Sequence, residues 1–148
     1  MASPSSSALD ELKAALGPSG WTEDQSEIAP WLTEWRNKWK GHTPLMLKPG
    51  TTGEVARAVE ICARHGVAIT PQGGDTGLVG GQIPMGEVLL STRRLRAVRD
   101  VTPLDDAMTV EAGVTLLEAQ QLAAKADRFF PLSLAAEGTA TIGGVIST

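Results

Sequence analysis

The stretch Pro71-Gln72-Gly73-Gly74-Asp75-Thr76-Gly77-Leu78-Val79-Gly80-Gly81 decides how this chain folds and what it binds. Five of its eleven residues are glycine, and it follows a strand-like run at 67–70. Because glycine has no Cβ, such a loop can turn with positive φ and lay its backbone close to a ligand. Successive N–H groups in such a turn form a concave anion site. The loop therefore predicts a diphosphate-binding element, and a surface turn without a ligand is the alternative.

The two standard phosphate-binding motifs are absent. No G-x-x-x-x-G-K-[ST] run occurs, which argues against a P-loop hydrolase. The spacing Gly74-x-x-Gly77-x-x-Gly80 is not G-x-G-x-x-G, and residues 83–90 favour a turn and a strand, whereas a Rossmann fold needs a helix there. We therefore expect a strand–loop–strand element to hold the phosphate.

Composition limits the classes of protein that this chain can represent. Its 148 residues, 42% of them hydrophobic, are enough for one domain or two small lobes. The net charge of −4 argues against a nucleic-acid surface, and no apolar stretch is as long as a membrane span. The Ser-rich start at 1–7 lacks the blocks of a signal peptide. Cys62 is the single cysteine, which excludes an internal disulfide and favours a reducing, cytoplasmic location.

The first part of the chain, residues 1–43, is expected to form a tail and a helical segment. Leucine spacing predicts an amphipathic helix at 8–16. Trp31, Trp35 and Trp39 recur every four residues, so a helix would place them on one face. A packing stripe is favoured over an aromatic wall for a ligand.

From residue 44 the pattern becomes β–α–β. Short strands at 45–47 and 67–70 flank a helix over 54–64, which Thr51 or Thr52 can cap at its start and Gly66 at its end. This arrangement predicts a parallel pair joined by a crossover. Further strands are expected at 88–90, 97–98 and 109–112, and a helix at 116–126. The predicted fold class is α+β.

A second glycine-rich region, 135–144, lies about sixty residues after the first. One loop can hold the diphosphate while the other lines the rest of an extended cofactor. With this pair, the chain resembles the N-terminal part of an FAD-binding domain of the PCMH or vanillyl-alcohol-oxidase type. It is most similar to the branch of D-lactate, D-2-hydroxyglutarate and glycolate dehydrogenase-like FAD-linked oxidases. The segments that carry this resemblance are 34–36, 47–55, 71–81, 108–114, 130–138 and 142–144.

The chain departs from the family pattern at a few positions. Asp75 stands where Asn is more usual, Val145 where Asn is frequent, and Thr139-Ala140 where Ser-Cys is commoner. No histidine lies in or beside the first loop, so the resemblance implies FAD that is bound without a covalent link.

The resemblance implies a PCMH-type fold in which residues 44–148 are part of the FAD-binding domain. The C-terminal part of that domain and the substrate-binding cap are expected to be missing, so no catalytic residue and no metal ligand is expected within the chain. The implied FAD contacts are Pro71, Gln72, Gly73, Gly74, Asp75, Thr76, Gly77, Leu78, Gly80, Gly81, Pro131, Leu134, Gly138, Thr139, Thr141, Ile142, Gly143, Gly144, Ser147 and Thr148.

The family oxidises a D-2-hydroxy acid to the 2-keto acid through FAD, and its electrons pass to a quinone, a cytochrome or an electron-transfer flavoprotein. The same fold also serves sugar-alcohol and lactone oxidases and cell-wall precursor reductases, so another substrate is one alternative. An inactive FAD-binding fragment is the other. For the 148 residues alone we expect weak FAD retention and no turnover.

Overall fold

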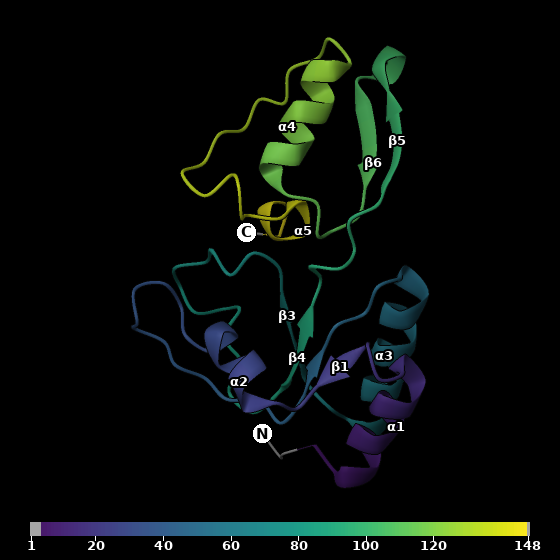
Figure 1. Cartoon of the computed structure of the whole chain (residues 1–148), viewed down its shortest axis with the longest axis vertical. Coiled ribbons are helices and arrows are strands. Elements are labelled where there is room, and N and C mark those ends of the chain that lie inside the picture. Colours follow the sequence, from purple (N-terminus) through teal and green to yellow (C-terminus); the bar gives the residue numbers. More distant parts are fainter. Residues whose placement is uncertain (1–3, 148) are drawn as a thin grey trace.

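A four-stranded sheet organises the N-terminal half of the protein, which the computed structural model describes over residues 4–147 (Figure 1). Its strands, in the order β1-β2-β4-β3, are β1 (Trp21–Thr22), β2 (Met46–Leu47), β4 (Val88–Ser91) and β3 (Ile69–Gln72). Strands β2, β4 and β3 are parallel, whereas β1 pairs antiparallel with β2. The predicted crossover therefore exists, but β4 inserts between the two strands that it joins.

Helices cover both faces of this sheet. On one face, α1 (Ser6–Leu16) and α3 (Thr52–His65) pack against β2 and β4 around buried residues such as Leu12, Leu47 and Leu90. On the other face, Met46 and Leu89 contact Ile28, the last residue of α2 (Gln25–Ile28). Since neighbouring strand residues point to opposite faces, β4 is buried on both. Each fully buried leucine contributes about 2 kcal/mol.

Helix α3 forms with the end signals that the sequence predicts. The Thr51 hydroxyl accepts from the Glu54 N–H at its start, and Gly66 ends it in the left-handed region at φ 64°. Cys62 is buried on its inner side, and that burial raises the pKa of the thiol. A neutral thiol packed in the core is what the sequence predicts for this residue.

The tryptophan-rich segment is not the helix that its four-residue spacing suggests. Helical structure ends with the 3₁₀ turn η1 (Ala29–Trp31), and a turn follows in which Thr33 bridges Lys40. The carboxylate of Glu34 accepts the N–H groups of Arg36 and Lys38, both at 2.7 Å. A side chain that binds nearby backbone N–H groups competes with a helix, which is why the helix is absent here.

A second lobe follows residue 97. Strand β5 (Val98–Thr102), the 3₁₀ turn η2 (Pro103–Asp105) and β6 (Ala107–Val110) form an antiparallel hairpin beside α4 (Leu116–Lys125), and α5 (Ile142–Val145) lies between the lobes (Figure 1). Thr115 and Glu118 form a reciprocal capping box at the start of α4. The α+β class is thus confirmed. Among residues 4–147 no helix has the length and apolar character needed to cross a bilayer.

Candidate functional site

The two glycine-rich loops meet where the lobes join. The first leaves the end of β3, and the second precedes α5 and is bonded to the segment after β6, where the Ile142 N–H donates to the Val114 carbonyl at 2.8 Å. A Cβ at Gly74 would overlap the carbonyl oxygen of Thr139, and one at Gly73 would overlap the hydroxyl of Thr141. These two glycines therefore allow the loops to pack directly against each other.

This contact changes the reason why glycine is needed in the first loop. The sequence suggests positive φ angles at its glycines, but of these only Gly80, at φ 80°, lies in the left-handed region. Gly77 is restricted by the Gln82 side chain, whose Oε1 would lie 2.6 Å from an added Cβ. Most of the glycines thus serve close packing between chain segments.

The first loop offers a run of backbone donors to a ligand. Among the described residues, no hydrogen bond uses the backbone N–H of any residue from 73 to 81 as its donor. Residues 73–77 are at the same time half-buried. Backbone N–H groups that have no protein acceptor, in a segment of this kind, are suited to an anion.

Asp75 has a local role different from the one that turn chemistry predicts. It adopts the left-handed region at φ 55°, which Asp and Asn tolerate better than most residues. Asp side chains in turns often cap nearby backbone N–H groups, but the Asp75 carboxylate accepts from the side-chain amide of Gln82 at 3.1 Å and no described loop N–H donates to it. Burial raises the pKa of Asp75, and the charge of Glu34 adds to this, while the Gln82 bond and Arg93 oppose it.

Two glutamine side chains hold the loop in shape. The buried Gln72 amide donates to the Trp31 carbonyl at 3.0 Å and to the Gln82 carbonyl at 3.1 Å, so it joins both ends of the loop to η1. Gln82 in turn donates to the Gly77 carbonyl at 2.8 Å. Because the Gln72 amide nitrogen is occupied by protein carbonyls, this residue positions the loop. No local sequence signal identifies Gln82, since its partners belong to the loop's own fold.

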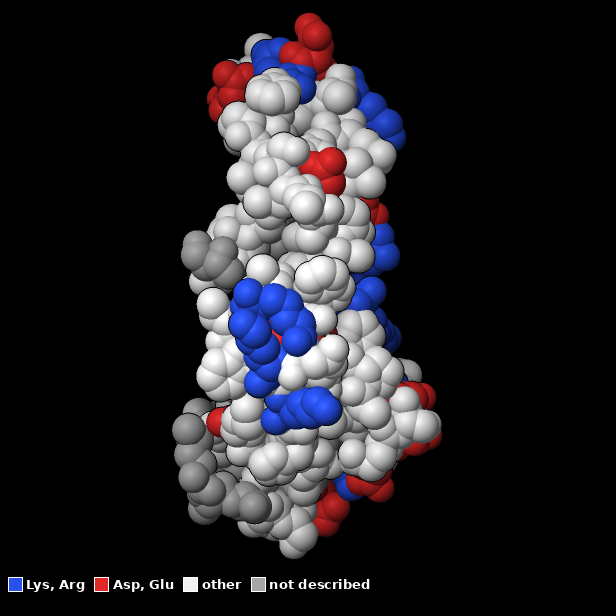
Figure 2. Space-filling model, turned by 90° about the vertical axis from the view of Figure 1, so that its left-hand side faces the viewer, with Lys and Arg blue, Asp and Glu red and all other residues white. Residues whose placement is uncertain are grey.

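The turn at 34–39 supports the outer side of the loop. The Arg36 guanidinium donates to the Leu78 carbonyl, and an added Cβ at Gly80 would lie 2.7 Å from the Trp39 ring. Burial alone would raise the pKa of the Glu34 carboxyl beneath them, but its backbone donors outweigh this effect and lower it. Figure 2 shows a cluster of Lys and Arg side chains near mid-height on this face of the molecule. Among the residues of the turn, Arg36 and Lys38 are exposed, as is Lys40, which follows it.

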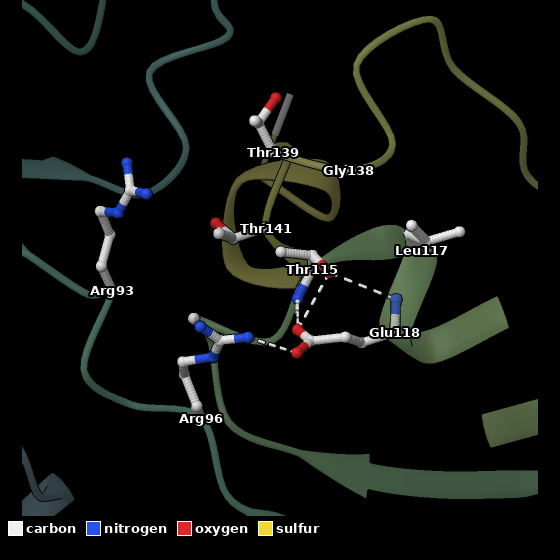
Figure 3. A pocket seen from close by; sticks show the side chains of 9 residues that line it. Arg93, Arg96, Thr115, Leu117, Glu118, Gly138, Thr139 and Thr141 are labelled. Atoms are coloured by element: carbon white, nitrogen blue, oxygen red, sulfur yellow. Dashed lines mark hydrogen bonds and ion pairs between the residues drawn. The ribbon is translucent and has the colours of Figure 1, made fainter. Parts of the chain in front are cut away.

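A cleft of about 300 Å³ opens beside the contact between the loops (Figure 3). The buried Thr141 lines it, and its hydroxyl oxygen has no hydrogen-bond partner among the described residues. On the floor of the cleft Arg96 pairs with Glu118, whose carboxylate also accepts from the Thr115 N–H at 2.8 Å. Arg93 lines the opposite side (Figure 3), and it belongs to no motif that the sequence reveals.

The structure brings together some of the predicted contacts and separates others. Gly73, Gly74, Asp75, Gly138, Thr139 and Thr141 lie at or beside the cleft. Pro131 lies apart from it, in a groove with Phe129 and Phe130 beside α4. Leu78, Gly81, Leu134, Gly144 and Ser147 are exposed, and Pro71 is exposed at the end of β3. Thr148 lies outside the described residues.

The remaining predicted contacts lie close to these loops. Thr76 and Gly77 are half-buried in the first loop, and Gly80 is half-buried under Trp39. Ile142 and Gly143 begin α5, where a Cβ at Gly143 would lie 2.8 Å from the Cβ of Ala112. Taken with the N–H groups that have no described acceptor and with the cleft, they define a two-lobed α+β domain whose two glycine loops pack together beside that cleft.

Comparison with known proteins identifies the family. Residues 43–148 match the FAD binding domain family, and the chain belongs to it. It is 36% identical over 123 residues to a D-2-hydroxyglutarate–pyruvate transhydrogenase of Saccharomyces cerevisiae. The aligned region covers 82% of this chain and 25% of that protein. It is 35% identical over 137 residues to a probable mitochondrial D-2-hydroxyglutarate dehydrogenase of Oryza sativa subsp. indica, covering 92% of this chain and 24% of that protein. The chain thus spans about a quarter of the length of these curated relatives.

Solved structures share the fold. An alkyldihydroxyacetonephosphate synthase superposes with a TM-score of 0.86 over 100% of this chain and 30% of its own, at 21% identity. A p-cresol methylhydroxylase gives a TM-score of 0.72 over 90% of this chain and 27% of its own, at 20% identity. The expected PCMH and vanillyl-alcohol-oxidase type of domain is confirmed, and its cofactor is FAD.

The residues present fit this cofactor. FAD carries a diphosphate, and the N–H groups of the half-buried residues 73–77 have no acceptor among the described residues. The Thr141 hydroxyl next to them is buried and unpartnered. A buried polar group without a partner is costly, so a ligand that supplies an acceptor explains both observations.

Proposed function

We propose that this chain is the FAD-holding part of a flavin-dependent dehydrogenase that oxidises a D-2-hydroxy acid to the 2-keto acid. The observation that carries the FAD site is the run of backbone N–H groups at 73–77 that have no acceptor among the described residues, in a half-buried segment beside the unpartnered Thr141 hydroxyl. The substrate class is supported by the relatives, which are named as D-2-hydroxyglutarate and D-lactate dehydrogenases.

Within this proposal the chain binds and orients FAD without a covalent link. When bound, FAD supplies the redox chemistry, because it accepts a hydride equivalent from the substrate carbon that carries the hydroxyl group. The protein's own contribution is to hold the diphosphate with loop donors, to line the cofactor with residues 138–144, and to exclude water where the lobes meet. The domain division at residue 43/44 and the full set of FAD contacts given above are part of the same proposal.

The FAD site is tested by calorimetric titration of the chain with FAD and with riboflavin, which lacks the diphosphate. We expect FAD to bind at least about tenfold more tightly, a difference equal to about 1.4 kcal/mol. Equal affinity for the two ligands would show that the loop does not bind the diphosphate.

The substrate arm uses the full gene product, loaded with FAD and kept free of oxygen. D-2-hydroxyglutarate, D-lactate or glycolate should bleach the oxidised flavin band, whereas the L-enantiomers of the chiral acids should not. Bleaching by a sugar alcohol but by none of the hydroxy acids would shift the proposal to the sugar-oxidising branch of the fold.

The electron acceptor and the compartment also belong to the proposal. We expect a separate acceptor such as a quinone, a cytochrome or an electron-transfer flavoprotein. The cytoplasm is the predicted compartment, while several relatives carry the word mitochondrial in their names. Fractionation of the native cells, followed by detection of the protein, distinguishes these two locations.

A further inference from the structure

Arg93 is a cation held at the cleft by an aromatic ring. It follows β4 in the segment that leads to the second lobe, and its guanidinium lies 4.5 Å from the centre of the Trp31 ring. Trp31 is fixed in turn, because its carbonyl accepts from the buried Gln72 amide. A guanidinium stacked on a ring keeps its charge and all of its N–H donors available at the edge.

The charge of Arg93 is not used by an ion pair within the described part of the chain. Arg96, the other arginine of the cleft, is paired with Glu118, whereas no described carboxylate lies within 4.0 Å of the Arg93 nitrogens. Its charge lowers the pKa of Asp75 in the glycine loop, as the smallest of the four effects that act on that carboxyl group. Arg93 is therefore the cation of this cleft that remains available to a ligand.

The glycine loop itself carries no positive charge, and Arg96 is already paired with Glu118. Residues 71–81 contain no Lys or Arg but do contain Asp75, and the whole chain carries a net charge of −4. Figure 3 shows Arg93 across the opening from Thr141, whose unpartnered hydroxyl lies on the side that faces it. A diphosphate carries two or more negative charges, so backbone donors beside a carboxylate leave it poorly neutralised.

We propose that Arg93, held in place by Trp31, binds the FAD diphosphate together with the backbone N–H groups of the glycine loop and balances the charge of Asp75. The proposal rests on the FAD site proposed above and adds a charged contact to its backbone donors. Trp31 is then a positioning residue, since it acts on the cofactor only through the guanidinium.

The test compares the affinities of Arg93→Gln for FAD and for riboflavin by calorimetry. Loss of one charge-assisted contact should weaken FAD binding about tenfold and leave riboflavin binding unchanged. The FAD affinity of the wild type should also fall more steeply with added NaCl than that of the variant. Arg99→Gln is the matched control, because Arg99 is also exposed but pairs with Glu111 just after β6, and it should change neither affinity.

Trp31→Leu tests the positioning. In that background Arg93→Gln should weaken FAD binding by a smaller factor than in the wild type. If wild-type protein prefers FAD over riboflavin and Arg93→Gln keeps that preference, the inference about Arg93 is wrong while the FAD site stands. If Arg93→Gln weakens both ligands equally, Arg93 only stabilises the fold. If the wild type shows no preference for FAD, both proposals fail.

Discussion

At the scale of single residues, Asp75 shows why the first loop accepts either Asp or Asn. The position needs a residue that tolerates φ 55° and whose side-chain oxygen can accept from Gln82, and both residue types meet these needs. We therefore expect Asp75→Asn to leave FAD affinity unchanged or to raise it by up to about tenfold, because a negative charge near the diphosphate is removed. Calorimetric titration of both proteins measures this, and a tenfold loss would show a carboxylate contact that this account lacks.

Because the pKa of Asp75 is raised, the difference in stability between the wild type and Asp75→Asn should depend on pH. A carboxyl group whose pKa is raised in the folded protein destabilises it once the group is charged. Wild type and Asp75→Asn should therefore melt at the same temperature in acid, below the unfolded pKa of about 3.9. As the pH rises through the folded pKa, the wild type should lose stability relative to the variant. A variant that is less stable at neutral pH would contradict this.

Gln72 joins the two ends of the glycine loop, and its removal should affect both stability and binding. Gln72→Met keeps the approximate volume but leaves the carbonyls of Trp31 and Gln82 without their donor. We expect a loss of about 1–3 kcal/mol in the free energy of unfolding, together with weaker FAD binding. Urea titration measures the stability. Gln25→Met, at an exposed site with only a 3.4 Å bond, serves as the control and should change it by about 0.5 kcal/mol or less.

At the scale of elements, the contact between the two loops means that some glycines tolerate replacement by Ala much less well than others. Gly74→Ala places a methyl group on the Thr139 carbonyl and should cost about 1–3 kcal/mol of stability while lowering FAD affinity. Gly81→Ala meets open space without a positive φ and should stay within about 0.5 kcal/mol of the wild type. Thermal melts and FAD titrations of this pair decide the point, and equal effects would mean that the loops do not pack as described.

The same elements show what the sequence can and cannot predict. Helix α3 is predictable because its signals, the cap at Thr51 and the glycine at Gly66, lie next to it in the chain. The spacing of Trp31 to Trp39 predicts a helix that does not form, because Glu34 accepts from the N–H groups that the helix would need. Glycine content marks the two loops, but it does not show that they pack together: the partner of Gly74 lies 65 positions further on, at Thr139, and no local pattern reveals such a contact.

At the scale of the whole molecule, the two lobes differ in how much core they contain. The buried hydrophobic clusters of the described residues belong to the N-terminal lobe, around Leu47 and Leu90 on one face and Leu89 on the other. Much of the β5–β6 hairpin is exposed. Without FAD, the amides of β6 and α4 should therefore exchange with solvent faster than those of β2 and β4.

A ligand held between the lobes should reduce that difference. FAD at a hundredfold excess over its Kd adds about 2.7 kcal/mol to the stability of the state that binds it. Hydrogen-exchange mass spectrometry with and without FAD measures the effect, and riboflavin at the same concentration is the control. Slower exchange confined to β2 and β4 would place the cofactor away from the junction.

The tryptophans give the protein an optical property that follows from their placement. All four lie between residues 21 and 39, in the N-terminal lobe. Trp31 stacks under Arg93 at the cleft, Trp39 packs on Gly80, and Trp35 is 80% exposed to water. Indole emission overlaps flavin absorption, so a flavin between the loops should accept excitation energy from Trp31 and Trp39. The intrinsic tryptophan fluorescence of the chain should therefore decrease as FAD occupies the site, so that FAD binding can be followed without an added label.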